Sequence, residues 1–448
     1  VTATCTRDVV YLARVTAVNL YFQGIQNLIF SLSMWRATEP FKARAKKILE
    51  NHNDDDVYEM RKRRNYQDFW RSIPMEEPYR VILAEVRDKL YNTREALQEV
   101  ISGKREALDP EDDSVFVSKE QLMEPLMACY ESLIEVGDAA VADGYLLDLI
   151  RQVNCFGLSL VKLDIRQESD RHADAMDAIT RHIGLGSYNE WDEEKRTAFL
   201  VEELEGKRPL ISNDLECSDE VQEVLDTFKM IAHLQRVCPG SLGTYVISMA
   251  TAPSDVLAVI LLLRESGLAR DLPVVPLFET LADLDGAAGA IDALLAIPWY
   301  REYTGGYQQV MIGYSDSAKD AGQFAAAWAQ YQAQEKLVAV AEKHGVRLSL
   351  FHGRGGAVGR GGGPAQSAIL SQPPGSVAGS LRVTEQGEMI RWKLGLPALA
   401  VQTLRRYLSA TLEATLNPPP APTQPQPSPP PPPAPPPLPN PPGAASVS

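Results

Sequence analysis

Five short apolar runs, separated by helical stretches, constrain the fold of this chain more than any other feature of its sequence. Each run is rich in Val, Ile or aromatic residues and has the length of a strand. They occupy residues 158–166, 243–249, 273–278, 309–314 and 347–351. A helix between two strands returns the chain to the edge of the sheet where it started, so the strands are expected to lie parallel. The sequence therefore predicts an α/β fold with a parallel sheet.

The region before these strands has a different pattern. Apolar residues recur at helical spacing through residues 1–50, 78–101 and 119–154. Residues 1–157 are therefore expected to form a helical region, and residues 158–417 to form the β/α portion.

The end of the chain is a proline-rich tail, residues 418–448. Residues 418–442 contain 17 prolines in 25 positions. This composition is typical of an extended, disordered segment that cannot form a core. Such tails act as spacers or bind proline-reading modules, so the tail is also a candidate partner-binding segment.

Charged or ionisable side chains stand where four of the runs end. Arg166 closes the first run, Glu279 follows the third, Asp316 the fourth and His352 the fifth. Glu279 and Asp316 are 37 residues apart, and Asp316 and His352 are 36 apart, which suits one βα unit each. Barrel enzymes place their chemistry at the carboxyl ends of the strands, so these residues predict a site at that edge. The alternative is that polar loops follow strands in every such fold.

Glu279 and Asp316 are the candidate metal ligands. Two carboxylates on neighbouring strand ends, without a nearby cysteine or paired histidine, favour a hard cation such as Mg²⁺ or Mn²⁺. Taken singly, each carboxylate is more typical of a helix cap or a salt bridge. Asp283 and Asp320 compete for the same role, although they lie further into the helices that follow.

Seven glycines and two arginines occur in the segment FHGRGGAVGRGGGP, residues 351–364. The segment fits neither G-x-G-x-x-G nor the ending of a P-loop, so these nucleotide-binding loops are excluded. Backbone N–H groups of such a loop, with the guanidinium groups of Arg354 and Arg360, suit phosphate or carboxylate oxygens. The alternative is a glycine linker.

Two further cations belong to the candidate site. Lys319 lies three residues after Asp316, at the start of a long helix predicted over 320–345. A lysine there adds charge to a helix N-terminus that already favours anions, although a solvated surface lysine is equally compatible. Arg166 is either a substrate-binding arginine or part of a structural ion pair.

Other polar residues are assigned structural roles. Surface or capping positions are expected for the remaining histidines, His52, His172, His182, His233 and His344. Hydrogen bonding within the fold is expected for Arg382, Glu385 and Gln386.

Composition excludes several classes of protein. A formal net charge of −15 argues against general nucleic-acid binding. No run of 18 or more apolar residues occurs, so no membrane span is expected. The five cysteines are scattered and form no C-x-x-C pair, which favours a reducing, cytoplasmic setting over a disulfide framework or a zinc site. Because the chain starts without Met or a secretory signal, it is expected to begin inside a longer protein.

Segments along the chain resemble those of one family, phosphoenolpyruvate carboxylase, and occur in the same order. They are LSMWR, LDIRQES, SMATAPSDVLAV, PLFETLADL, MIGYSDSAKDAG, FHGRGGAVGRGGGP, ILSQPPGS and RVTEQGE. The resemblance covers residues 1 to about 420, and RVTEQGEMIRWKLGLP is similar to the bacterial type. It implies a mostly helical fold around a (β/α)8 TIM-like barrel, incomplete in this chain, with many additional helices.

The resemblance also implies a reaction and a set of roles. The reaction joins phosphoenolpyruvate and bicarbonate to give oxaloacetate and phosphate, by way of carboxyphosphate and a metal-bound enolate. Glu279 and Asp316 would hold Mg²⁺ or Mn²⁺, Lys319 would be catalytic and Arg166 would bind substrate. In the glycine loop the resemblance implies catalytic roles for His352, Arg354 and Arg360, and substrate binding by Gly353, Gly355 and Gly356.

One catalytic segment of the family is missing from the sequence. The family has a catalytic histidine in a Thr-Ala-His-Pro segment, and no His-Pro dipeptide occurs here. The isolated chain is therefore expected to be inactive, as a fragment lacking the family's N-terminal catalytic-histidine region and its C-terminal region. The alternatives are a non-catalytic or partner-dependent subunit of a larger carboxylase complex, and a fragmentary gene product. The resemblance implies a homo-oligomer, a tetramer in the family, or a hetero-complex with another carboxylase.

Overall fold

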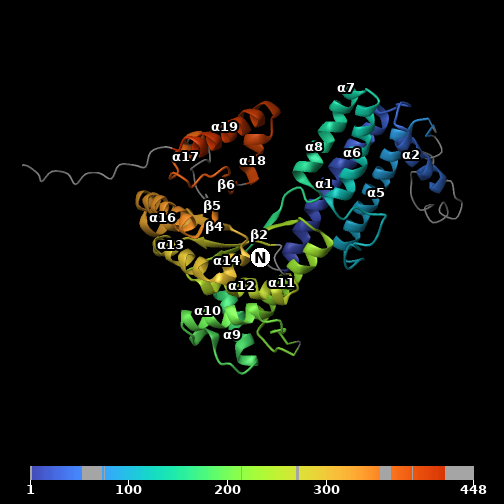
Figure 1. Cartoon of the computed structure of the whole chain (residues 1–448). Coiled ribbons are helices and arrows are strands. Elements are labelled where there is room, and N and C mark those ends of the chain that lie inside the picture. The colour runs from blue at the N-terminus through green and yellow to red at the C-terminus, as the bar shows by residue number, and fades with distance from the viewer. Residues whose placement is uncertain are drawn as a thin grey trace, which may run out of the picture.

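The computed structural model describes most of the chain. The described residues are 3–52, 73–74, 76–212, 214–268, 272–353, 365–385 and 387–418. Figure 1 shows a helical bundle on one side, a central sheet covered by helices, and a last group of helices beside the end of the sheet. The predicted proline-rich tail lies outside the described residues except for Pro418.

The helical bundle forms the first part of the chain, as the helical spacing predicts. Its elements are α1 (Ala3–Ser31), α2 (Glu39–His52), α5 (Pro78–Ile101), α6 (Lys119–Glu135), α7 (Ala139–Val141), η1 (Ala142–Leu146) and α8 (Leu147–Phe156). Helix α1 packs along α5 and also reaches α11 (Asp219–Val237) and β1 (Leu163–Glu168). Its buried side chains, such as Tyr11, Val18 and Ile25, recur at helical spacing. Helix α1 therefore connects the bundle to the sheet.

The sheet contains six strands in the part of the chain that the structure describes. They are β1, β2 (Leu242–Ser248), β3 (Val274–Phe278), β4 (Tyr307–Gly313), β5 (Arg347–Gly353) and β6 (Arg382–Val383). Their order follows the chain and every neighbouring pair is parallel. The structure thus confirms the predicted parallel sheet and the mostly helical, incomplete barrel. Strand β6 was not predicted, because its two residues are too few to produce a periodic signal.

Helices form every connection between consecutive strands. The crossovers contain α9 (Ser169–His182), η2 (Tyr188–Glu190), α10 (Glu193–Glu205), α11, α12 (Pro253–Glu265), α13 (Leu281–Ala296), α14 (Pro298–Tyr303), α15 (Ser315–Ala321), α16 (Gln323–His344) and α17 (Ala365–Leu370). Helices α18 (Gly387–Leu394) and α19 (Pro397–Leu416) follow β6. Residues 320–345 were predicted as one helix, but Gly322 at φ 80° separates α15 from α16. Gly345 ends α16 with φ 65°, as predicted for a glycine at that position.

The two faces of the sheet carry different side chains. Ile165, Ile247 and Phe278 point outward into the large core beneath the helices. The opposite, inner face has its own smaller apolar cluster, made of Val246, Val275, Leu277, Met311 and Phe351. Because side chains alternate along a strand, residues two apart from these inner residues also lie on the inner face. This alternation decides which strand-end residues can meet.

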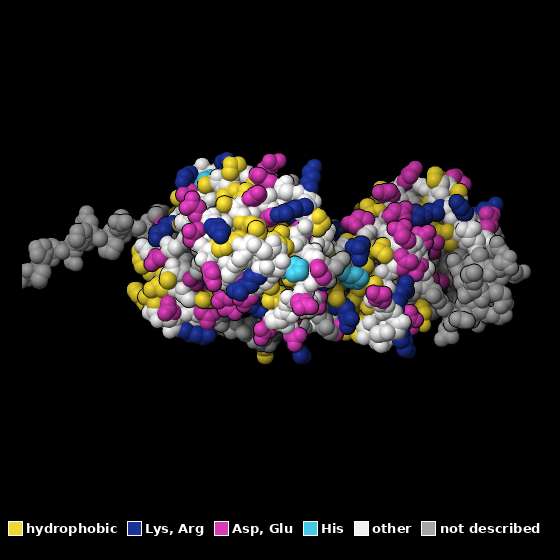
Figure 2. Space-filling view, turned by 90° about the horizontal axis from the view of Figure 1, so that it is seen from below, with side chains coloured by type: hydrophobic (Ala, Val, Ile, Leu, Met, Phe, Trp, Pro, Cys, Tyr) yellow, Lys and Arg dark blue, Asp and Glu magenta, His cyan; other side chains and the backbone are white. Residues whose placement is uncertain are grey.

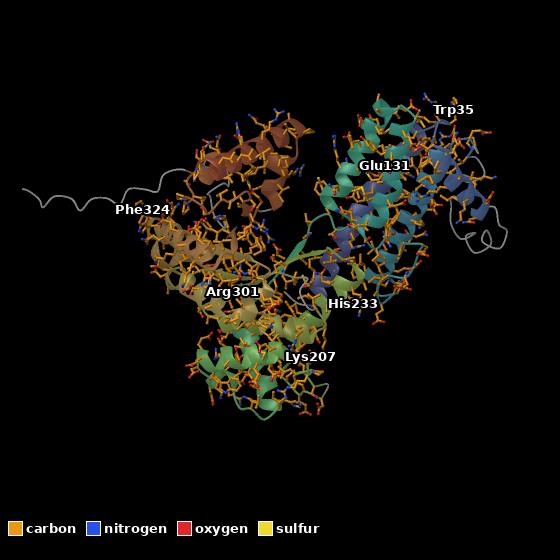
Figure 3. All side chains as sticks on the ribbon, viewed as in Figure 1. Trp35, Glu131, Lys207, His233, Arg301 and Phe324 are labelled. Atoms are coloured by element: carbon orange, nitrogen blue, oxygen red, sulfur yellow. The ribbon has the colours of Figure 1, made fainter. Side chains whose placement is uncertain are left out.

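Charged side chains of both signs cover the surface. Figure 2 shows acidic and basic groups interspersed over the described face that it presents. No helix among the described residues combines the length and the apolar character needed to cross a membrane. Several large apolar side chains are exposed, including Trp35 in the bundle and Phe324 on α16, which Figure 3 labels.

His172 is buried, and its expected surface or capping position is therefore wrong. Its side chain is 1% exposed and lies between α9 and the outer face of the sheet. The Tyr245 hydroxyl donates its proton to Gln167 Oε1 at 2.7 Å. The hydroxyl oxygen of Tyr245 therefore accepts a hydrogen bond from His172 Nε2, also at 2.7 Å. The sequence around His172 is polar and helical, so it did not indicate that the side chain would meet Tyr245 on β2. His182 is exposed, whereas His233 and His344 are half-buried. The His52 side chain is outside the described set.

The burial of His172 predicts a pH-dependent stability. Burial lowers the pKa of His172 from 6.5 to about 3, with the charge of Arg171 acting in the same direction. Below pH 6.5 the unfolded chain binds a proton that the folded chain excludes, so stability falls as the pH falls. Between pH 7 and pH 5 this group should cost about 2 kcal/mol. Urea unfolding at pH 7 and pH 5 measures this loss of stability. The loss should be about 2 kcal/mol smaller in His172→Gln than in the wild type. Equal losses in the two proteins would contradict the prediction.

Candidate active site

The carboxyl ends of β1 and β3 bring Arg166 and Glu279 together on the inner face. Arg166 Nη2 donates to Glu279 Oε1 at 2.6 Å. The Glu279 side chain is 7% exposed, whereas that of Arg166 is 49% exposed. The buried carboxylate therefore has a cationic partner that still faces solvent. The two residues lie side by side, although β1 continues for two residues beyond Arg166, which was expected to close it.

A strained residue after β2 supplies a second donor to Glu279. Met249 has φ 56°, a conformation that residues other than glycine seldom adopt. Its carbonyl accepts from the Ser169 hydroxyl at 2.9 Å, and its N–H donates to Glu279 Oε2 at 3.4 Å. Sequence reasoning missed this contact, because a backbone donor in an unusual conformation leaves no side-chain signature.

Asp316 and Lys319 complete the charged group from helix α15, which follows β4. Lys319 Nζ donates to Asp316 Oδ1 at 3.0 Å. The Lys319 side chain is 77% exposed and that of Asp316 is 46% exposed. The resulting row of charges runs from Arg166 through Glu279 and Asp316 to Lys319, with the two carboxylates between the two cations. The pattern of strand ends predicted Arg166, Glu279 and Asp316, and Lys319 was predicted from its position three residues after Asp316.

The two carboxyl groups influence each other. Burial raises the pKa of Glu279; the charge and hydrogen bond of Arg166 oppose this shift, and the charge of Asp316 adds to it. The pKa of Asp316 lies below its ordinary value, chiefly because Lys319 hydrogen-bonds it; a hydrogen bond with Glu279 acts in the same direction. The two carboxyl groups are therefore close enough to share a proton.

Two paired glycines allow close packing beside Glu279. Gly313 at the end of β4 is the register partner of Gly353 at the end of β5. A Cβ on Gly313 would lie 2.9 Å from Glu279 Cα, and one on Gly353 would lie 2.7 Å from Met311 Cε. Side chains at these positions would therefore collide with the backbone of Glu279 and with the inner apolar cluster. Gly353 was a predicted site residue; Gly313 was missed, although a glycine at a strand end indicates a close approach.

His352 lies on the other face of the sheet. Its neighbours along β5, Phe351 and Gly353, face inward, so alternation directs the His352 side chain outward. The side chain is fully buried, and Nδ1 is hydrogen-bonded to the Tyr314 hydroxyl at 2.8 Å. The described contacts do not bring His352 into the charged row. Four predicted residues of the glycine loop lie outside the described residues: Arg354, Gly355, Gly356 and Arg360.

The competing carboxylates have other partners. Asp283 Oδ2 accepts from Thr280 N at 2.9 Å, and Asp283 N donates to Thr280 Oγ1 at 3.1 Å. This reciprocal pair caps the start of α13. Asp320 Oδ2 accepts from Leu281 N at 3.2 Å at the same helix end. Both residues therefore cap α13, which leaves Glu279 and Asp316 as the candidate metal ligands.

The donor set fits a hard divalent cation. Mg²⁺ and Mn²⁺ prefer oxygen ligands, and Mg²⁺ commonly takes one or two carboxylates and completes its shell with water and substrate oxygens. Glu279 and Asp316 supply two such carboxylates, and Gly313 packs closely against the backbone of Glu279. Within the described ranges, no group of three or more His, Cys, Asp and Glu residues could hold a metal ion. Such an ion would therefore depend on water or substrate for its other ligands.

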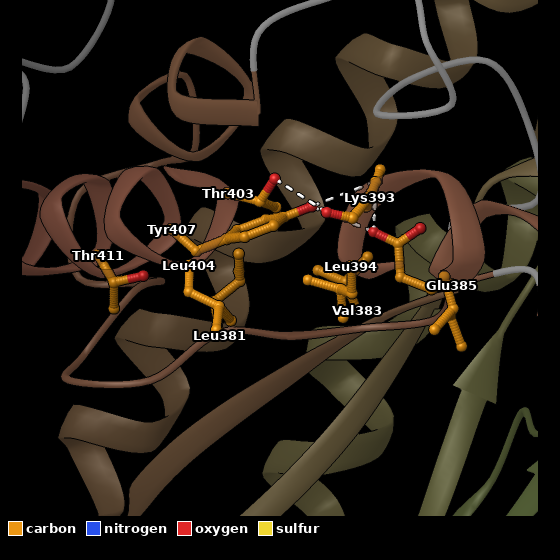
Figure 4. A pocket seen from close by; sticks show the side chains of 10 residues that line it. Leu381, Val383, Glu385, Lys393, Leu394, Thr403, Leu404, Tyr407 and Thr411 are labelled. Atoms are coloured by element: carbon orange, nitrogen blue, oxygen red, sulfur yellow. Dashed lines mark hydrogen bonds and ion pairs between the residues drawn. The ribbon is translucent and has the colours of Figure 1, made fainter. Parts of the chain in front are cut away.

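A hollow beside β6 has a different character. Its volume is about 240 Å³, and it lies between the end of β6, α18 and α19 (Figure 4). Glu385 Oε1 accepts from Lys393 Nζ at 2.6 Å and from the Tyr407 hydroxyl at 3.1 Å. These contacts confirm the predicted structural hydrogen bonding of Glu385. Gln386, which was assigned the same role, lies outside the described residues. The polar groups of this hollow are occupied with one another.

The fold and the charged row define a class of protein. A parallel sheet whose strands alternate with helices, with charged side chains at the carboxyl ends of the strands, is the architecture of β/α-barrel proteins.

Comparisons with known proteins define the family. A family model described as phosphoenolpyruvate carboxylase matches residues 1–429. Phosphoenolpyruvate carboxylase 2 of Arabidopsis thaliana is 54% identical over 419 residues, which are 94% of this chain and 42% of that protein. The phosphoenolpyruvate carboxylases of Phaseolus vulgaris and Glycine max are 53% and 54% identical over the same shares. The chain belongs to the phosphoenolpyruvate carboxylase family. The chain spans 42% of the length of these relatives. All three relatives are plant proteins, so the resemblance to the bacterial type stays a prediction.

Proposed function

We propose that this chain carries metal- and phosphate-binding residues for the carboxylation of phosphoenolpyruvate by bicarbonate, which yields oxaloacetate and phosphate. The observation that supports it best is the row Arg166, Glu279, Asp316 and Lys319 beside the paired glycines. Family membership supports the choice of this reaction over other reactions of β/α barrels.

Each residue of the row has a physical role in this proposal. Arg166 and Lys319 are the exposed cations, and they neutralise the charge of the phosphate and carboxylate groups of the substrate. Glu279 and Asp316 hold Mg²⁺ or Mn²⁺, which when bound supplies positive charge that stabilises an anionic oxygen of the reacting substrate. The hydrogen bond and charge of Arg166 favour the ionised, ligating form of Glu279 and oppose the effect of burial, which raises the pKa of this carboxyl group.

The glycines and His352 act differently from the charged residues. Gly313 and Gly353 allow neighbouring strands to approach closely, which helps to hold Glu279 in place. His352 lies on the outer face, so we assign it to holding Tyr314 at the start of α15. That contact positions the helix that carries Asp316 and Lys319. Arg354 and Arg360 are proposed as phosphate ligands from their place in the sequence alone.

Equilibrium dialysis of labelled phosphoenolpyruvate tests the proposal. The chain should bind phosphoenolpyruvate in the presence of Mn²⁺ and more weakly without it, because the cation offsets the charge of the carboxylate pair. Lys319→Ala should weaken binding by roughly tenfold, as expected for one lost charge-assisted contact. Lys336→Ala is the matched control, since Lys336 is an exposed lysine on α16 that pairs with Asp285. Binding that does not depend on Mn²⁺, or no binding at all, would contradict the proposal.

A further inference from the structure

An ion pair joins the first and last described strands of the sheet. Arg382 on β6 donates from Nη2 to Asp164 Oδ1 at 2.7 Å and to Oδ2 at 2.6 Å. These strands stand at opposite ends of the order β1 to β6 and are not ladder neighbours. The contact therefore spans the inner face of the curled sheet.

Both partners of this pair are held by further contacts. Arg382 Nη1 donates to Gln309 Oε1 at 2.8 Å, and its guanidinium carbon lies 4.1 Å from the centre of the Phe351 ring. Asp164 Oδ1 also accepts from Thr244 N at 3.0 Å and from Thr244 Oγ1 at 2.8 Å. Charge-assisted bonds with several fixed partners constrain geometry more than a single surface pair does.

The backbone beside Asp164 is shaped around its carboxylate. A Cβ on Gly243 would lie 2.5 Å from Asp164 Oδ1. Glycine at the start of β2 therefore allows the carboxylate to sit against the neighbouring strand while it faces β6. The side chains of Arg382 and Asp164 are 32% and 29% exposed, so the pair is only partly screened by water.

Asp164 is linked directly to the candidate active site through its strand. Asp164 and Arg166 are two residues apart on β1 and so share the inner face. A shift of β1 at Asp164 would move Arg166 away from Glu279 Oε1, which it now meets at 2.6 Å. Phe351, on which Arg382 stacks, belongs to the apolar cluster beneath that contact.

We propose that Arg382 is a positioning residue: its ion pair with Asp164 fixes strand β1 so that Arg166 meets Glu279 in the substrate-binding arrangement. This inference rests on the proposed function, because Arg166 and Glu279 are its substrate- and metal-binding residues. Arg382 acts through Asp164 and β1. Its own contacts are with Asp164, Gln309 and Phe351.

Phosphoenolpyruvate binding in the presence of Mn²⁺ tests this role on the full chain. Arg382→Met should weaken binding by about 10- to 100-fold, the range typical of residues that orient a metal ligand. Arg382→Lys keeps the charge and should recover most of that loss. Arg347→Met is the matched control, since this arginine also stacks on an aromatic ring, Tyr307, but lies at the start of β5.

Hydrogen exchange gives a second readout that needs no ligand. If Arg382 holds β1 in place, the backbone amides of β1 should exchange faster in Arg382→Met, while those of α5 in the bundle should not change. Faster exchange confined to the sheet, together with weaker binding, supports the inference. If the wild type binds phosphoenolpyruvate and Arg382→Met binds it equally well, the inference is overturned. A wild-type chain that binds no phosphoenolpyruvate contradicts the proposed function instead, so the two failures are distinguishable.

Discussion

Replacing Asp316 with asparagine is expected to weaken Mn²⁺ binding by more than about 100-fold, because the substitution removes one of the two carboxylate ligands. Replacing a residue that only orients a metal ligand usually has a smaller effect, about 10- to 100-fold. The substitution keeps the shape of the side chain. It loses an exposed ion pair with Lys319, which contributes less than about 1 kcal/mol to stability. The fold should therefore survive while the site fails. Free Mn²⁺ measured by its electron paramagnetic resonance signal during titration gives the affinity directly.

Asp320→Asn is the matched control for this experiment. Asp320 lies four residues further along α15, and its carboxylate accepts from Leu281 N at the start of α13. Its replacement should leave the Mn²⁺ affinity within about twofold of the wild type, since surface changes that touch no ligand have small effects. If Asp320→Asn abolished binding and Asp316→Asn did not, the assignment of the metal ligands would be wrong.

Gly313→Ala is expected to lower both the stability of the fold and the affinity for Mn²⁺. The added Cβ would lie 2.9 Å from Glu279 Cα and 3.0 Å from the Phe278 carbonyl oxygen. Both atoms belong to the backbone where β3 ends, so that backbone itself would have to move. Overpacking of this kind costs about 1–3 kcal/mol, and it displaces Glu279 at the same time. Urea unfolding measures the first effect, and Mn²⁺ titration measures the second.

Gly286→Ala separates the steric effect from the general effect of replacing glycine. Gly286 lies within α13, and a Cβ there would meet nothing within 4 Å. Alanine is the better helix former, so this variant should gain about 0.5–1 kcal/mol of stability and keep its Mn²⁺ affinity. A Gly313→Ala protein as stable as Gly286→Ala would show that β3 and β4 do not pack as closely as described.

Much of the sheet and the charged row could be predicted because both depend on local patterns. Apolar runs of strand length predicted β1 to β5, and parallel strands place their carboxyl ends at one edge. Arg166, Glu279 and Asp316 each follow or close such a run, so their proximity followed from topology alone. Lys319 was found because it lies one helical turn after Asp316.

Other features depend on contacts that no local pattern records. The residues of the site were chosen by where each apolar run ends, which does not record the face of the strand. Alternation in RLSLFHG places His352 on the face of Leu348 and Leu350, away from Glu279. Strand β6 is too short for a periodic signal, which also hid the contact between Arg382 and Asp164. His172 seemed polar and exposed in its helix, yet Tyr245 on β2 offers it a buried hydrogen bond.

The central claim is that Glu279 and Asp316 form a metal site at the edge of the sheet where its strands have their carboxyl ends. A crystal of the chain grown with Mn²⁺ and phosphoenolpyruvate, measured near the manganese absorption edge, tests it most directly. The account predicts one anomalous peak in contact with both carboxylates, with phosphoenolpyruvate beside Arg166 and Lys319. A peak elsewhere, with no density between Glu279 and Asp316, would contradict it.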